Sequence, residues 1–73
     1  MENYPITVFW SSEDNAYIAI VPDLPGCSAG GNTEIEAIHE VHLAMDLWLK
    51  AATEIGNPIP KPSHPKFLSK KVA

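Results

Sequence analysis

The sequence predicts an α+β fold, with a small antiparallel sheet of three to four strands and one long helix packed on one face. Three observations predict it: two short stretches of alternating apolar residues, a turn-rich stretch over residues 21–33, and one long amphipathic segment. The expected order of elements is β-β-β-α-β. We expect residues 1–63 to form one domain and residues 64–73 to form a tail or a final short strand.

Two strands are expected in the first third of the chain. In residues 4–10, aromatic and aliphatic side chains recur at every second position from Tyr4 to Trp10, which is typical of a strand. A polar turn over residues 11–15 leads to a second strand over residues 16–21. Both strands carry apolar side chains on both faces. We therefore expect the helix to cover one face and another protein chain to cover the other.

The turn-rich stretch, Val-Pro-Asp-Leu-Pro-Gly-Cys-Ser-Ala-Gly-Gly-Asn-Thr, connects the strands to the helix. Its residues 22–26 predict a turn, and residues 27–30 predict at most a short third strand. Thr33 is a good N-cap, and Glu36 three residues later completes a capping box. The helix is expected from residue 34 to residue 55, because Gly56 suits a helix C-terminus and Pro58 prevents continuation.

The expected helix has an apolar side and a polar side when it is projected at about 100° per residue. The apolar side predicts the core residues Ala37, Ile38, Val41, Ala44, Met45, Trp48, Leu49, Ala52 and Ile55. Leu43 and Leu47 instead fall among the polar residues, one turn apart. Such a pair is either incidentally exposed or part of a contact between protein chains. We take Leu43 and Leu47 as candidates for an oligomer interface.

The small size of the chain favours self-association. A core built from 73 residues contributes only about 3–5 kcal/mol of net stability, and small chains usually need a further constraint. Cys27 is the only cysteine, which excludes an internal disulfide, and no Cys/His set has structural zinc spacing. We therefore expect a homodimer or a homotetramer.

The charge of the chain is unevenly distributed. Residues 1–60 hold all nine acidic residues and one lysine, a net charge of −8, whereas residues 61–73 hold four lysines. There is no arginine. Because nucleic-acid binding depends on clustered basic residues, the body of the chain is a poor candidate for it, and we expect no direct DNA binding. An acidic body fits a basic partner, although ordinary solubility charge is an alternative.

The sequence also indicates where in the cell the protein is located. Glu2 is acidic and no cleavable signal pattern follows it. No apolar run approaches the roughly 20 residues of a membrane-spanning helix. Together with the single cysteine, these features favour the cytoplasm.

Four groups of residues are of types that can support catalysis or bind a ligand, but none of them predicts catalysis, a cofactor or a metal site. His39, His42 and Asp46 share one helical face but lack a fourth metal ligand. Cys27 is better explained as a small apolar residue than as a nucleophile. The glycine-rich residues 30–33 match no phosphate-binding fingerprint. The carboxylates of residues 13, 14 and 23 are expected at neighbouring strand ends, where a divalent ion for nuclease chemistry is a minor alternative.

Three segments, in order and at the right spacing, closely resemble the HicB antitoxin family: residues 17–27, 31–37 and 57–63, which read Tyr-Ile-Ala-Ile-Val-Pro-Asp-Leu-Pro-Gly-Cys, Gly-Asn-Thr-Glu-Ile-Glu-Ala and Asn-Pro-Ile-Pro-Lys-Pro-Ser. The resemblance implies a partial RNase H-like fold without the catalytic carboxylates of RNase H enzymes. It also implies a partner, a HicA-type toxin, which is a small basic RNA-cleaving protein with a catalytic histidine. Inhibition is then expected by occlusion of that histidine.

The acidic loops are the expected contact surface for this partner. They contain Glu13 and Asp14 in the first turn, and Asp23, Leu24 and Pro25 in the second. All five are expected to be exposed because turn residues usually lie at the surface. Two alternatives remain open at this point: a regulatory or structural module without a toxin, and a weak metal-dependent nuclease.

Overall fold

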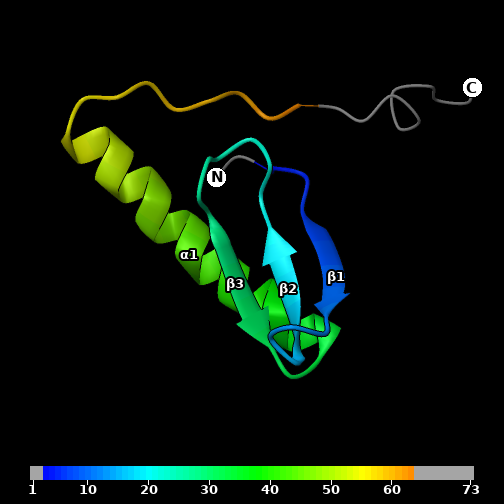
Figure 1. The fold of residues 1–73 in the computed structure, drawn as a ribbon. Helices are drawn as coiled ribbons and strands as arrows, with labels where there is room; N and C mark the ends of the chain where they lie inside the picture. Colours follow the sequence, from blue (N-terminus) through cyan, green and yellow to red (C-terminus); the bar gives the residue numbers. More distant parts are fainter. Residues whose placement is uncertain (1–2, 64–73) are drawn as a thin grey trace, which may run out of the picture.

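The computed structural model describes residues 3–63 as three antiparallel strands and one long helix (Figure 1). The strands are β1 (Thr7–Ser11), β2 (Ala16–Ile20) and β3 (Ser28–Gly31), and the helix is α1 (Glu34–Glu54). This arrangement confirms the predicted α+β class. The tail or final strand expected for residues 64–73 lies outside the described residues.

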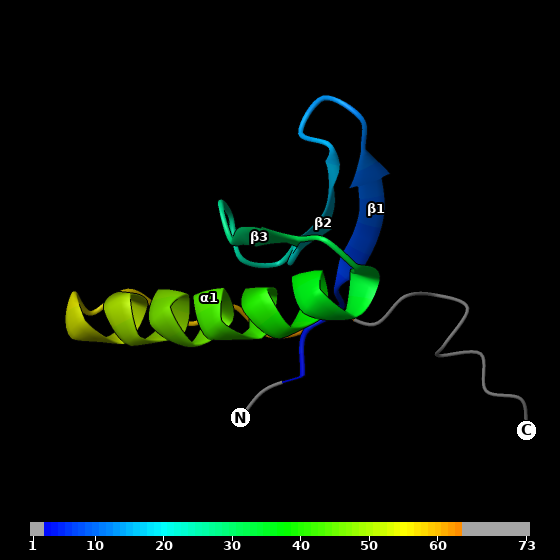
Figure 2. The ribbon, with the colours of Figure 1, turned by 90° about the horizontal axis from the view of Figure 1, so that it is seen from below.

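The sheet has the simple order β1-β2-β3, so each strand pairs with its neighbour in the sequence. In the β1–β2 register Val8 lies opposite Ala19 and Phe9 lies opposite Ile18. Because side chains alternate between faces, the two pairs lie on opposite faces. Val8 and Ala19 belong to the core beneath the helix, so Phe9 and Ile18 lie on the face that α1 does not cover (Figure 2).

The helix begins and ends where local chemistry predicts. Thr33 is the N-cap, and its side-chain oxygen accepts a hydrogen bond of 3.0 Å from the Glu36 N–H. The Glu36 carboxylate accepts from the backbone N–H of Asn32, so the box closes one residue earlier than in the usual pattern. At the other end Gly56 has a φ of +81°.

The end of α1 forms a Schellman motif. The Asn57 N–H donates to the Ala52 carbonyl at 2.9 Å, and the Gly56 N–H donates to the Thr53 carbonyl at 3.1 Å. The left-handed conformation that Gly56 adopts is what allows these two bonds. The helix therefore stops at Glu54, one residue before the expected end, with Ile55 as its C-cap.

The core lies between the sheet and one side of α1. Nine apolar residues of the described chain are buried there: Tyr4, Ala19, Val21, Leu24, Cys27, Ala37, Val41, Met45 and Ala52. Ile38, Ala44, Trp48 and Leu49 of the predicted stripe are half-buried. Ile55 was expected in the core, which is wrong, since it is 71% exposed. The C-terminal half of α1 extends past the edge of the sheet, so no strand lies over the end of the stripe (Figures 1 and 2).

A close approach between β3 and α1 brings the two layers together. A Cβ atom added to Gly31 would lie 2.6 Å from the Ala37 nitrogen and 2.9 Å from the Glu36 carbonyl carbon. The backbone of the strand therefore passes directly against the first turn of the helix. Only a residue without a side chain fits this position.

Candidate partner-binding surface

The turn after β2 is tightly folded, and its three central side chains have different surroundings. The Val21 N–H donates to the Cys27 carbonyl at 3.0 Å, and the Cys27 N–H donates to the Leu24 carbonyl at 2.9 Å. These bonds direct Leu24 inward, where it is 0% exposed. Asp23 is half-buried and Pro25 is exposed. The prediction that Leu24 is exposed is therefore wrong, because the compact turn directs this side chain into the core.

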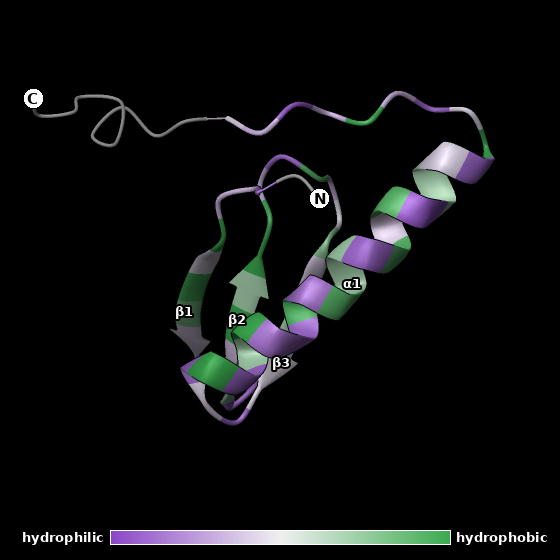
Figure 3. Ribbon diagram, turned by 180° about the vertical axis from the view of Figure 1, so that it is seen from behind, coloured by the Kyte–Doolittle hydropathy of each residue, from purple (hydrophilic) through white to green (hydrophobic). Residues whose placement is uncertain are grey.

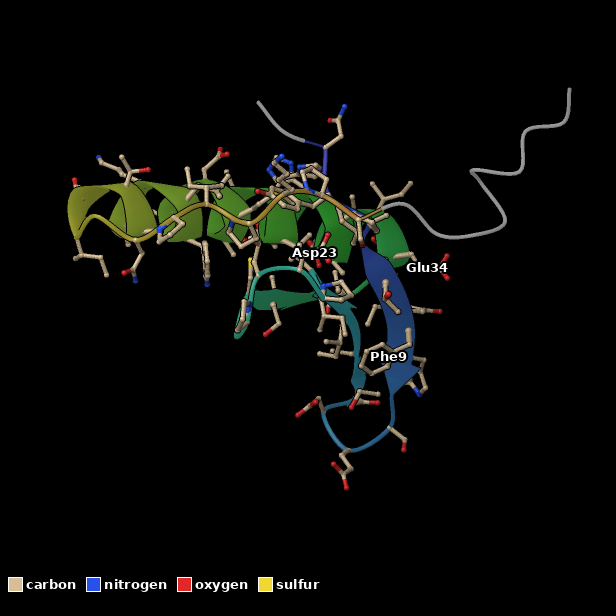
Figure 4. All side chains as sticks on the ribbon, turned by 90° about the horizontal axis from the view of Figure 1, so that it is seen from above. Phe9, Asp23 and Glu34 are labelled. Carbon is tan, nitrogen blue, oxygen red and sulfur yellow. The ribbon has the colours of Figure 1, made fainter. Side chains whose placement is uncertain are left out.

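Asp23 holds the extended segment that follows the helix. Its carboxylate accepts a hydrogen bond of 2.8 Å from the Ser63 N–H, and the Ser63 hydroxyl lies 3.1 Å from both carboxylate oxygens. The Tyr4 hydroxyl donates to the Pro60 carbonyl in the same segment. Residues 57–63 are thus fastened across the molecule at two points, and Asp23 lies directly beside this segment (Figure 4).

Trp48 links the helix to the same turn. Its indole Nε1–H donates to the Pro25 carbonyl at 2.9 Å. This bond fixes the exposed turn against the C-terminal half of α1 and explains why Trp48 is half-buried. Pro25 therefore presents a rigid, positioned surface.

The turn between β1 and β2 forms a second, separate acidic site. Glu13 and Asp14 are both exposed. The Ser11 hydroxyl donates to the Asp14 carboxylate at 2.9 Å, and the Asp14 N–H donates back to the Ser11 oxygen at 3.3 Å. Asn15 has a φ of +53°, a conformation that asparagine tolerates better than most residues. This tip projects away from α1 (Figure 2).

The two acidic sites lie at opposite ends of β2. Glu13 and Asp14 precede this strand, whereas Asp23 follows it. The expectation that these carboxylates sit at neighbouring strand ends is therefore wrong: successive turns of an antiparallel meander alternate between the two ends of a sheet. Among residues 3–63, no group of three or more histidine, cysteine, aspartate or glutamate side chains is placed to hold a metal ion.

Cys27 lies in the core rather than at the surface. Its side chain is 5% exposed, and burial raises the pKa of the thiol above its ordinary value. A raised pKa keeps the sulfur protonated near neutral pH, whereas a nucleophile needs the thiolate. Cys27 is thus a packing residue in this structure.

The outer surface of α1 is mixed in polarity. Seen from behind, the helix lies in front of the sheet and its ribbon alternates between purple and green along its length (Figure 3). Leu43 is 50% exposed and Leu47 is 69% exposed, as their positions among polar residues predict. The described part of the chain contains no helix with the length and apolar character that a membrane crossing requires.

Several contacts of this surface could not be found from the sequence. Ser63, Trp48 and Pro60 bind partners that lie 40, 23 and 56 positions away in the chain. No local pattern signals such pairs, because periodicity and turn chemistry report only on neighbouring residues. The prolines of residues 57–63 do indicate an extended path, but not where that path is anchored.

The fold and this surface define a small α+β protein in which one helix backs a three-stranded antiparallel sheet. A family model described as the HicB-like antitoxin of bacterial toxin-antitoxin systems matches residues 4–72. The UPF0150 protein ssl0259 of Synechocystis sp. is 36% identical over 58 residues, which cover 80% of this chain and 78% of that relative. The chain therefore belongs to the HicB-like antitoxin family. Membership indicates a toxin–antitoxin role, with a toxin as the general class of partner.

Proposed function

We propose that this protein neutralises a HicA-type RNA-cleaving toxin in the cytoplasm by covering the toxin's active site, without catalysis of its own. Membership in the HicB-like antitoxin family is the observation that carries this proposal. The charge of the described surface supports it. An RNA-cleaving toxin must present basic residues to phosphates, and α1 alone carries five acidic residues against one lysine.

Glu13 and Asp14 are the proposed electrostatic contacts. Both are exposed at the tip of the β1–β2 turn, where a basic surface can approach without displacing the core. Pro25 is the proposed apolar contact, because it is exposed and held in place by Trp48. Asp23 has its carboxylate bound to Ser63, so its proposed role is to position residues 57–63 at the edge of this surface.

We also propose self-association, to a homodimer or a homotetramer. Leu43 and Leu47 are the proposed contact residues on α1, since together they expose a leucine pair one turn apart. The open face of the sheet is a second surface available for the same purpose. There Phe9 is 45% exposed and lies opposite Ile18 in the register.

The proposal is tested by capturing the tagged full chain from its native cells and identifying what binds by mass spectrometry. The expected partner is a small basic protein recovered near equal stoichiometry. The purified partner should cleave RNA alone and lose that activity when the chain is added. Recovery of the chain with only copies of itself would favour the alternative of a regulatory or structural module without a toxin.

A double charge reversal tests the proposed contacts. Glu13→Lys with Asp14→Lys should weaken toxin binding by about tenfold or more, equivalent to about 1.4 kcal/mol, because two exposed attractive charges become repulsive. The matched control is Glu40→Lys with Asp46→Lys, which makes the same change of net charge on exposed positions of α1. Equal losses in both variants would mean that net charge alone matters and that the tip is not a specific contact.

A further inference from the structure

The end of α1 that extends past the sheet contains a hollow with a cavity volume of about 250 Å³. Its walls are mainly apolar and come from the last two turns of the helix, its C-cap and the second residue after the cap: Trp48, Ala51, Ala52, Ile55 and Asn57. Ile55 is 71% exposed at its rim. The Schellman motif shapes this hollow, because it turns the chain back so that Asn57 closes one side.

The electrostatics at this end of the helix are unbalanced. The C-terminus of a helix carries a partial negative charge, which a lysine or arginine in the last turn usually offsets. The last turn of α1 contains no basic residue, and Glu54 adds a full negative charge there. Lys50 is exposed one turn earlier, four residues before Glu54. A helix end without a basic residue in its last turn therefore lies beside an apolar hollow.

This combination matches the side chain of a lysine or an arginine. Such side chains place an aliphatic stem on apolar surface and a cation at its polar edge. Here the stem has the walls of Ala51 and Ile55. The cation has the negative helix C-terminus, and Glu54, which does not line the hollow, adds its charge from the same last turn. The ring of Trp48 supplies an aromatic wall, and the edge of that ring is already tied to Pro25.

We propose that this hollow receives a lysine or arginine side chain of the basic protein that the chain binds, so that the partner surface extends from Pro25 onto the end of α1. The inference rests on the proposed function for the identity of the partner. A second copy of the chain is a poorer occupant, because it carries a net charge of −4 even with the four lysines of residues 61–73 counted, whereas the proposed partner is basic.

The side-chain preference can be measured without the partner. The probe is N-acetyl-arginine methylamide, and its neutral isostere N-acetyl-citrulline methylamide is the control. Titration into the isotopically labelled full chain should shift the backbone amide signals of Ala51 and Ile55 and the indole signal of Trp48. The shifts should saturate in the millimolar range with arginine and stay below a third of that size with citrulline.

Two substitutions locate the effect. Ala51→Phe fills the hollow from an exposed position and should abolish the saturable shifts, whereas Asp46→Phe, on another side of the helix, should leave them unchanged. Glu54→Gln should weaken arginine binding by about three- to fivefold, as expected for one charge beside a helix terminus. Equal shifts with citrulline, shifts spread over all acidic residues, or persistence in both variants would overturn the proposal.

The partner, once isolated, separates this inference from the proposed function. If the basic protein binds the chain and loses RNase activity, but Ala51→Phe binds as tightly as Asp46→Phe, the inference fails and the proposed function stands. If no toxin is recovered while arginine still binds in the hollow, the proposed function fails and the side-chain site remains. If Ala51→Phe weakens partner binding and Asp46→Phe does not, the result supports both the inference and the proposed function.

Discussion

Substitution of Gly31 by alanine tests whether the contact between β3 and α1 holds the two layers together. The added Cβ would lie 2.6 Å from the Ala37 nitrogen and 2.9 Å from the carbonyl carbon of Glu36. Both atoms belong to the helix backbone, so no side-chain rotation relieves the clash. Either the first turn of α1 moves away from the sheet or β3 shifts outward, and both movements open the core around Ala37.

The expected cost follows from the atoms involved. Extra methyl groups in a packed interior typically cost about 1–3 kcal/mol, and a clash with backbone belongs in the upper part of that range. A chain of this size has only about 3–5 kcal/mol of net stability. With a urea dependence of about 1 kcal/mol per molar for a domain this small, Gly31→Ala should lower the unfolding midpoint by roughly 2 M.

The matched control is Gly30→Ala, one residue earlier in the same strand. A Cβ added there would meet only Ile18 Cδ1 and the Tyr17 carbonyl oxygen, both at 3.4 Å, which is ordinary van der Waals contact. Both variants should be unfolded in urea at one protein concentration, because self-association shifts the midpoint. If Gly31→Ala is as stable as Gly30→Ala, the layers are not held at this distance and the reasoning is refuted.

Three further predictions concern the helix end, the helix surface and the buried thiol. Gly56→Ala should lower the free energy of unfolding by about 1 kcal/mol, because an alanine at a φ of +81° is strained; Gly56→Asn should cost less in the same urea assay. Leu43→Lys with Leu47→Lys should dissociate the proposed oligomer in sedimentation experiments, and an oligomer that stays intact would exclude that surface of α1 as its interface. The free energy of unfolding should fall as the pH rises above 9.0, the ordinary pKa of a cysteine thiol. The reason is that the Cys27 thiol ionises there in the unfolded chain, while burial keeps it protonated in the folded chain. Comparing the unfolding of the wild-type chain and Cys27→Ala at neutral pH and at about pH 10 measures this loss, and identical pH dependence would contradict it.

The elements with local causes were predicted closely. Thr33 caps the helix and Gly56 ends it by hydrogen bonds within a few residues of each position, and the observed helix differs from the expected one by one residue. The second strand was predicted almost to its ends, residues 16–21 against Ala16–Ile20. The first strand begins at Thr7 rather than at residue 4, because Tyr4 is used to hold Pro60 and Pro5 has no N–H for a sheet.

The candidate surface was predicted less well than the fold. Asp23 and Leu24 are adjacent in a turn of ordinary composition. Leu24 is fully buried, whereas the Asp23 carboxylate accepts a hydrogen bond from Ser63. Turn composition predicts that a segment lies at the surface, but it does not say which side chain points inward. That depends on what lies beneath the turn, which here is the core of β2 and α1.

By itself the sequence determined the helix, its ends, the order of strands and the acidic character of the body, since all of these follow from residues close in the chain or from composition. It also carried the resemblance to an antitoxin family, which the comparison over residues 4–72 confirms. Only the tertiary structure decided that the two acidic turns lie at opposite ends of the sheet, that Trp48 fixes Pro25, and that Ile55 is left uncovered. The physical reason is that these features depend on where α1 crosses the sheet and how far it extends beyond it. Contacts across 23 to 56 residues set that geometry, and no local pattern contains it.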